Sequence, residues 1–142
     1  MEEQIAHIQE LVDDAVKSGA KLWTGGKRNA ALKTGHFYEP TMLTGVTPDM
    51  RIFHEEVFGP VMSIVQVPKD SDAACVDLVN NSAFGLGSSV FCGDPKRGLA
   101  IARQLRTGMC CVNDFGSHYL VQSLPFVGAK ESGFGRSGVR SK

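Results

Sequence analysis

Two adjacent glutamates and a nearby phenylalanine are the residues of this chain whose types and spacing could do chemistry. They are Glu55, Glu56 and Phe58, in the run EEVFGP at residues 55–60. A carboxylate can accept hydrogen bonds from both hydroxyl groups of a ribose, and a neighbouring aromatic ring can flank a planar heterocycle, so the run could hold a nucleotide sugar. The alternative is a solvated turn between a helix and a strand, with Phe58 in the core, because adjacent charges usually lie in water. Spacing alone does not decide between the two.

The cysteines and histidines do not form a second chemical centre by their spacing. Cys75, Cys92, Cys110 and Cys111 lack the C-x-x-C spacing of a zinc site or a redox motif. We interpret them as small apolar residues that fill strands and helices in a reducing compartment. His54 precedes two glutamates, but the second histidine of a metal-binding H-E-x-x-H helix is missing, so we expect no metal ion.

Gly85 and Gly87 look like the start of a glycine-rich loop that binds phosphates. Val90 occupies the position of the third glycine in G-x-G-x-x-G, and the segment leads into a predicted strand. A dinucleotide-binding loop needs a strand before it and a helix after it, because the N–H groups at the helix start point at the pyrophosphate. We therefore interpret these glycines as a tight turn before a strand.

The composition limits the class of protein. With 142 residues and 42% hydrophobic residues, the chain matches a single globular domain. Its 15 basic and 15 acidic residues balance, so nothing favours a nucleic acid as partner. The sequence shows neither a signal peptide nor an apolar run long enough to span a membrane, so the default compartment is the cytoplasm.

Strands and helices are predicted to alternate along the chain. Periodic apolar residues predict a helix over residues 4–18. Short apolar or β-branched runs predict extended segments at 21–24, 37–43, 61–67, 87–91 and 109–113, with 61–67 buried on at least one face. Thr47, Ser71 and Asp94 are predicted N-caps, and a proline follows Thr47 and Asp94 at the expected first helical position. This order predicts an α/β fold with a parallel sheet and right-handed crossover helices.

The residues that follow strand 109–113 are predicted to form a long irregular loop over 114–124. In α/β folds, ligands gather beyond the carboxyl ends of parallel strands, where loops carry the binding residues. We therefore expect contacts with a substrate in this loop.

Four motifs in the same order along the chain resemble the aldehyde dehydrogenase superfamily. They are FYEPT at 37–41, EEVFGPV at 55–61, NNSAFGL at 80–86 and PFVGAKESGFGR at 125–136. The resemblance extends from the first helix to Arg136, and it implies that residues 1–142 are a partial aldehyde dehydrogenase catalytic domain. The implied activity is oxidation of an aldehyde to a carboxylic acid with NAD or NADP. The stretches CVNDF at 111–115 and QSLPF at 122–126 resemble a plant and fungal branch whose members carry an N-terminal membrane anchor.

The resemblance also implies roles for four residues. In the family, the glutamate before x-F-G-P binds the hydroxyl groups of the nicotinamide ribose and the phenylalanine packs beside the nicotinamide, and these match Glu56 and Phe58. Phe126 matches an aromatic residue that lines the tunnel for the aldehyde. Asn113 matches an asparagine at the end of the strand before the tunnel loop. The choice between NAD and NADP depends on a Rossmann domain that has no counterpart in these residues.

The resemblance implies that this chain is inactive by itself. The nucleophilic cysteine, the general-base glutamate, the oxyanion-hole asparagine and the Rossmann domain of the family lie before the region that corresponds to Met1. Two alternatives stay open: a noncatalytic module that associates with full-length aldehyde dehydrogenase subunits, and an acyl-phosphate reductase of the same superfamily. Val127 replaces a glycine of the family, so we expect its β-branched side chain to crowd a backbone conformation that glycine permits.

Overall fold

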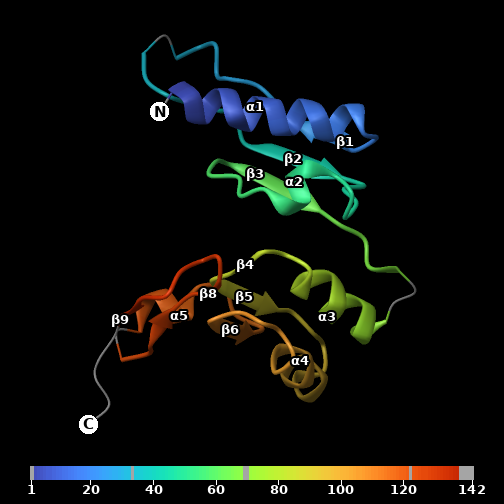
Figure 1. Cartoon of the computed structure of the whole chain (residues 1–142), viewed down its shortest axis with the longest axis vertical. Coiled ribbons are helices and arrows are strands. Elements are labelled where there is room, and N and C mark those ends of the chain that lie inside the picture. Colours follow the sequence, from blue (N-terminus) through green and yellow to red (C-terminus); the bar gives the residue numbers. More distant parts are fainter. Residues whose placement is uncertain (1, 33, 69–70, 122, 138–142) are drawn as a thin grey trace. The chain divides into compact units, whose positions relative to one another are not determined.

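The computed structural model describes residues 2–32, 34–68, 71–121 and 123–137 of the chain. The chain divides into two compact units, Met1–Gln66 and Val67–Lys142, which are coloured blue to green and yellow-green to red in Figure 1. Each unit has its own helices and its own paired strands, so each one positions its own part of a site.

The first unit combines a long helix with a three-stranded sheet. Helix α1 (Glu2–Lys17) confirms the predicted amphipathic helix, and β1 (Lys21–Thr24) confirms the first predicted strand. The sheet has the order β1-β2-β3, with β2 (Thr41–Thr44) in the centre and β3 (Val61–Ile64) at one edge. Strand β1 is antiparallel to β2, whereas β3 is parallel to β2 and follows it through helix α2 (Arg51–His54).

The core of the first unit lies between α1 and the sheet. Leu11 of α1 and Leu43 of β2 are fully buried, and Val12 and Val46 are buried almost as completely. The cluster also contains other buried residues: Ile5, Ile8, Ala15, Ala20, Tyr38, Met50 and Ile52. The apolar positions of α1 recur at helical spacing, so one face of the helix enters the core and the other faces water.

Strand β3 is shorter and more exposed than the sequence predicted. The prediction of a strand over 61–67 that is buried on one face is wrong, because the strand ends at Ile64 and its own contact with the core is limited to the half-buried Val61; Val65, which also packs against the core, lies beyond the strand. Met62 and Ile64 lie opposite Met42 and Thr44 of β2, and their side chains are 62% and 41% exposed. Helix α1 buries the face of the sheet that carries Leu43, so the β-branched and apolar residues on the other face stay in solvent.

Helix α2 begins later than its predicted cap. We predicted Thr47 as the N-cap, but the helix starts at Arg51 and its N-cap is Met50, which makes no capping hydrogen bond through its side chain. Thr47 instead accepts a backbone hydrogen bond from Met50 in a turn, at 3.1 Å, and its side chain hydrogen-bonds the carboxylate of Asp49. The threonine hydroxyl group is therefore occupied within the turn that precedes the helix.

The second unit contains a parallel strand pair joined by a helix. Strand β5 (Gly87–Val90) pairs in parallel with β6 (Met109–Val112), and helix α4 (Pro95–Ala102) connects them and contacts both. Helix α3 (Asp72–Asn80) precedes them. Both predicted caps are confirmed: the side chain of Ser71 accepts from the N–H of Ala74, and that of Asp94 accepts from the N–H of Lys96. Helices that connect parallel strands confirm the predicted α/β class.

Short strands complete the second unit. Strand β4 (Phe84–Gly85) is antiparallel to β8 (Ala129–Lys130), and β7 (Phe126–Val127) is antiparallel to β9 (Arg136–Ser137). The segment 114–124 was predicted to be an irregular loop, but it contains the single-turn helix α5 (Ser117–Leu120). Position 122, which belongs to the QSLPF motif, lies outside the described residues.

Two sequence-based interpretations of the backbone are wrong. Gly85 lies in a strand, and a Cβ atom there would be 2.5 Å from the carbonyl oxygen of Arg106, so close approach of the backbone explains the glycine better than a turn. Val127 lies in a strand, which suits a β-branched residue, and it is not one of the residues with positive φ. The close backbone approach in this region falls at Gly108, where a Cβ would be only 1.8 Å from the Val127 carbonyl oxygen.

Replacement of Leu43 by alanine should destabilise the chain by about 2–5 kcal/mol, because it removes fully buried methyl groups and leaves a cavity. The free energy of unfolding in urea, followed by far-UV circular dichroism, measures this effect. Met62→Ala on the adjacent strand is the control, since its exposed side chain should change the stability by no more than about 0.5 kcal/mol. Equal losses in the two variants would contradict the position of the core.

Candidate cofactor and substrate site

The first two sequence motifs meet at the start of two parallel strands. The N–H of Thr41, the last residue of FYEPT, donates to the carbonyl oxygen of Pro60 at 2.8 Å. Thr41 also lies opposite Val61 in the β2–β3 register. Segments that are far apart in the sequence therefore form one local structure, which fixes the position of residues 55–60.

Three polar residues of α1 contact the segment 51–58. We call Gln4, His7 and Glu10 the polar edge of α1; a spacing of three places them on neighbouring turns of one side of the helix. The side-chain amide of Gln4 donates to the carbonyl oxygen of Phe58 at 3.4 Å. His7 lies 3.9 Å from the carboxylate of Glu55, and Glu10 accepts from Arg51 at 2.6 Å. The polar edge thus contacts the segment 51–58 at three points.

The two adjacent glutamates have different environments. Arg51 donates to both carboxylate oxygens of Glu55, from Nε at 2.7 Å and from Nη2 at 3.2 Å. These hydrogen bonds lower the pKa of Glu55, and the charges of Arg51 and His7 act in the same direction. Glu56 is exposed and has no hydrogen bond or ion pair to any other described residue. Only Glu56 therefore has a carboxylate that is free for a ligand.

Phe58 lies at the surface. Its side chain is 69% exposed, so the alternative that places Phe58 in the core is wrong. The ring borders a cavity of about 370 Å³ that is lined by α1, by His36 and by parts of two motifs, at residues 37–38 and 58–60. Glu56 does not line this cavity. An exposed aromatic ring two residues after a free carboxylate is an arrangement that can contact both the base and the sugar of a nucleotide.

Asn113 joins the ends of the parallel strands in the second unit. Its Nδ2 donates to the carbonyl oxygen of Cys92 at 2.9 Å, and its Oδ1 accepts from the N–H of Cys92 at 2.8 Å. Its own N–H donates to the carbonyl oxygen of Val90 at 2.8 Å. The residue has φ = 54°, a left-handed conformation that asparagine adopts more readily than most residues. Both functional groups of its side chain are occupied, so Asn113 shapes the strand end in this structure.

Phe126 lies in β7 and is half-buried. Its ring centroid is 5.4 Å from that of Tyr119 in α5, with the ring planes tilted by 53°. Phe126 lines a cavity of about 370 Å³ together with Leu86, Gly128, Ser132 and residues 135–137. Sequence reasoning did not identify Tyr119, although an aromatic residue inside the predicted tunnel loop was the available signal. Asn113 is not among the residues that line this cavity.

The last two motifs are joined by polar side chains that sequence reasoning missed. The ammonium group of Lys130 donates to the carbonyl oxygens of Asn80 and Ser82, at 3.0 and 2.8 Å. The side chain of Asn80 accepts from the N–H of Arg106 at 2.7 Å and donates to the carbonyl oxygen of Gln104 at 2.9 Å. These contacts satisfy carbonyl groups at the end of α3 and hold the segment that contains Phe126.

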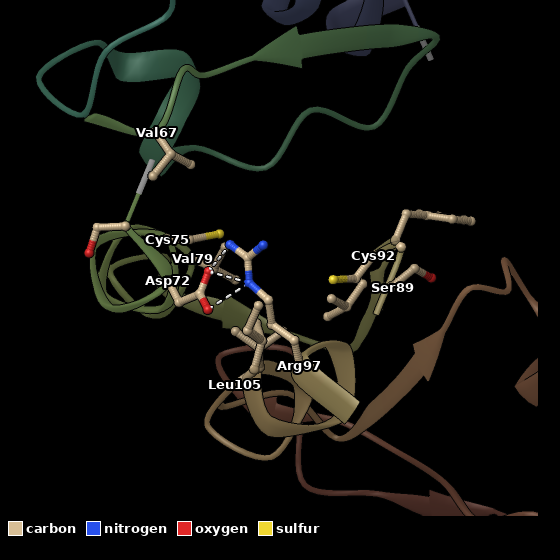
Figure 2. A pocket seen from close by; sticks show the side chains of 13 residues that line it. Val67, Asp72, Cys75, Val79, Ser89, Cys92, Arg97 and Leu105 are labelled. Atoms are coloured by element: carbon tan, nitrogen blue, oxygen red, sulfur yellow. Dashed lines mark hydrogen bonds and ion pairs between the residues drawn. The ribbon is translucent and has the colours of Figure 1, made fainter. Parts of the chain in front are cut away.

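Two of the cysteines line a separate cavity of about 490 Å³ between α3, α4 and the end of β5. Figure 2 shows Cys75 and Cys92 on either side of the Arg97 guanidinium group, which is paired with Asp72 through Nε at 2.9 Å and Nη2 at 2.6 Å. This ion pair neutralises the charges in the cavity. Cys110 is exposed, so the interpretation of all four cysteines as buried fillers is wrong for this residue.

No group of three or more histidine, cysteine, aspartate or glutamate residues is arranged to hold a metal ion in the part of the chain that the structure describes. Within the same residues, no helix combines the length and the apolar character needed to cross a membrane.

The four motifs lie in two pairs, one pair joined within the first unit and the other within the second. Residues 1–142 match the aldehyde dehydrogenase family. The chain therefore belongs to the aldehyde dehydrogenase family, and its fold is a fragment of the aldehyde dehydrogenase domain.

Three similar proteins illustrate the relationship. The chain is 44% identical over 133 residues to an aldehyde dehydrogenase-like protein of Saccharomyces cerevisiae, covering 92% of this chain and 20% of the relative. It is 45% identical over 135 residues to the NADP(+) succinate-semialdehyde dehydrogenase of Deinococcus radiodurans, and the match covers 95% of this chain and 27% of that relative. The crystal structure of a Mycobacterium tuberculosis aldehyde dehydrogenase with NAD+ matches with a TM-score of 0.84 at 34% identity. The match covers 97% of this chain and 28% of the Mycobacterium protein. The chain thus spans between 20% and 28% of these proteins.

Lys130→Met should destabilise the second unit by about 1–3 kcal/mol, because two partly buried carbonyl groups lose a charged hydrogen-bond donor. The free energy of unfolding in urea measures the loss. Lys96→Met is the matched control, since the Lys96 side chain is exposed and no described residue pairs with its ammonium group. A Lys130→Met variant as stable as the control would mean that Lys130 does not hold the two motifs together.

The pH dependence of Glu55 tests the arrangement of the adjacent acids. Because the pKa of Glu55 is lowered in the folded chain, its contribution to stability is present above the ordinary glutamate pKa and is lost as the pH falls through the lowered value. An NMR titration of the Glu55 side chain should give a midpoint below the usual range of a glutamate. In Arg51→Met the midpoint should rise toward that range, and an unchanged midpoint would contradict the bidentate pair.

Proposed function

We propose that residues 1–142 are the C-terminal portion of the catalytic domain of a longer aldehyde dehydrogenase, which oxidises an aldehyde to a carboxylic acid with NAD or NADP. The observation that supports this most directly is the free carboxylate of Glu56, two residues before the exposed ring of Phe58. The family membership and the names of the relatives agree with this activity. The relatives that we compared are several times longer than this chain, so the activity belongs to the longer protein.

Four residues of the chain have proposed roles in that reaction. The carboxylate of Glu56 would accept hydrogen bonds from the hydroxyl groups of the nicotinamide ribose, since no described residue competes for its oxygens. Phe58 would pack against the nicotinamide and exclude water from its face. Phe126 would form part of the wall that contacts the aldehyde, and Asn113 would set the position of the loop next to it. Bound nicotinamide would supply the acceptor for the hydride.

We place the nucleophile outside these residues. Cys75 and Cys92 line a cavity with a neutralised ion pair, and neither thiol is hydrogen-bonded to a described histidine or carboxylate that could take its proton. Cys110 is exposed on β6, and among the described residues its thiol donates to the neighbouring carbonyl group of Cys111 at 3.7 Å. A thiol without a base is a weak nucleophile, so this chain alone should not turn over an aldehyde.

The cofactor, compartment and branch are further parts of the proposal. The Deinococcus relative is named for NADP(+) and the Mycobacterium structure contains NAD+, so we assign NAD or NADP without choosing. The free thiols of Cys75, Cys92 and Cys110 fit a reducing compartment such as the cytoplasm. The 44% identity with the Saccharomyces protein, together with the CVNDF and QSLPF stretches, supports the plant and fungal branch. No described contact favours the noncatalytic module.

Glu56→Gln in the longer enzyme should lower kcat/KM for the nicotinamide cofactor by about 10- to 100-fold, because a neutral amide cannot replace charged hydrogen bonds to two hydroxyl groups. Formation of NADH or NADPH, followed by absorbance with a simple aldehyde, measures this. The 142-residue chain, assayed in parallel, should be silent although it folds. Turnover by the short chain, or full activity of Glu56→Gln, would refute the proposed placement of the site.

A further inference from the structure

We infer that Arg51 is a positioning residue for the cofactor-binding carboxylate of Glu56. This inference rests on the proposed function. Arg51 does not touch Glu56 or line the cavity beside Phe58. Its side chain instead connects Glu55, the residue immediately before Glu56, to helix α1.

The geometry of the Arg51 side chain fixes Glu55 at two atoms. Nε and Nη2 donate to the two carboxylate oxygens of Glu55 at 2.7 and 3.2 Å, and Nη1 donates to Glu10 at 2.6 Å. One planar guanidinium group thus binds a carboxylate with two parallel bonds and still reaches α1. An ammonium group cannot form this fork, so lysine would keep the charge and lose the orientation.

The backbone of Glu55 is fixed as well. Its N–H donates to the carbonyl oxygen of Arg51 at 2.9 Å and ends helix α2, with φ = −90° and ψ = 141°. Because both the backbone and the side chain of Glu55 are held, the direction in which the chain leaves toward Glu56 is set. Glu56 has no partner of its own in the described chain, so its position depends on its neighbours.

The charge of Arg51 is a second reason to expect that it positions Glu56. Glu55 and Glu56 are adjacent acids, and Glu10 is close to the same guanidinium group. Arg51 neutralises the charge of Glu55, so that the carboxylate of Glu56 does not have to move away from a like charge. Without Arg51, the carboxylates of Glu55 and Glu10 would lose the guanidinium group that they share, and Glu55 precedes Glu56 directly in the chain.

The consequence is a specific kinetic effect of Arg51→Met. The KM for NAD or NADP should rise about 10-fold, because misplacement of a binding group by a fraction of an ångström weakens its hydrogen bonds. The KM for the aldehyde should change by less than about 2-fold, since the residues assigned to the substrate belong to the second unit. Arg51→Lys should recover part of the loss, because it restores the charge but not the fork.

Arg97→Met is the matched control. Arg97 forms a bidentate ion pair with Asp72 that is also exposed and lies far along the chain from the cofactor segment; Figure 2 shows this pair. The control loses the same kind of interaction and should leave the KM for the cofactor unchanged. Urea unfolding of all variants identifies any general loss of stability.

A double variant shows whether Arg51 acts through Glu55. In the Glu55→Gln background, Arg51→Met should raise the KM for the cofactor by much less than 10-fold, because the bidentate pair is already broken. An equal rise in both backgrounds, or an equal rise in Arg51→Met and Arg97→Met, would overturn the inference. If Glu56→Gln itself has no effect, the proposed function fails. If Glu56→Gln weakens binding of the cofactor and Arg51→Met does not, only the positioning role of Arg51 fails.

Discussion

The packing of α1 against the first sheet is the interaction on which the candidate cofactor segment depends. Leu11 and Leu43 are fully buried in this contact. The same helix presents its polar edge to residues 51–58, and Ile8 lies so close to Gly59 that a Cβ there would be 2.4 Å from its Cδ1 atom. Any shift of α1 along the sheet would therefore move its core contacts and its contacts with the site together. Core packing and site geometry are thus set by one helix.

The second unit is held together in a different way. Among its described residues, Val76 and Met109 are the large apolar side chains that are buried, whereas Phe91, Phe115, Leu120 and Phe134 are at least 67% exposed. Order comes instead from side chains that bind the backbone, namely Asn80, Asn113 and Lys130. Exposed apolar area of this extent is what a segment of a larger folded body presents, in agreement with the short coverage of the relatives.

Local sequence signals predicted most of the elements. Side-chain caps at Ser71 and Asp94 and the periodic apolar face of α1 are properties of a few consecutive residues, and these predictions are confirmed. The start of α2, the exposure of β3 and the reason for Gly85 depend on contacts with distant residues, and these predictions failed. A cap residue can bind a neighbouring side chain instead, and a strand is buried only if another element covers it.

The roles of single residues in the candidate site also could not be predicted from local sequence alone. Glu55 and Glu56 are identical and adjacent, so composition and spacing cannot assign them different roles. The assignment of Glu56 came from the resemblance to a family, and the contacts of Arg51 give it a physical basis, because they occupy the carboxylate of Glu55. A binding residue must keep its polar atoms free of internal partners, yet its backbone must be held firmly by its neighbours. Arg51, which is held by Glu10, binds Glu55 before Glu56, and Gln4 binds the carbonyl oxygen of Phe58 after it. These contacts meet the second requirement without violating the first, because they leave the carboxylate of Glu56 open to solvent.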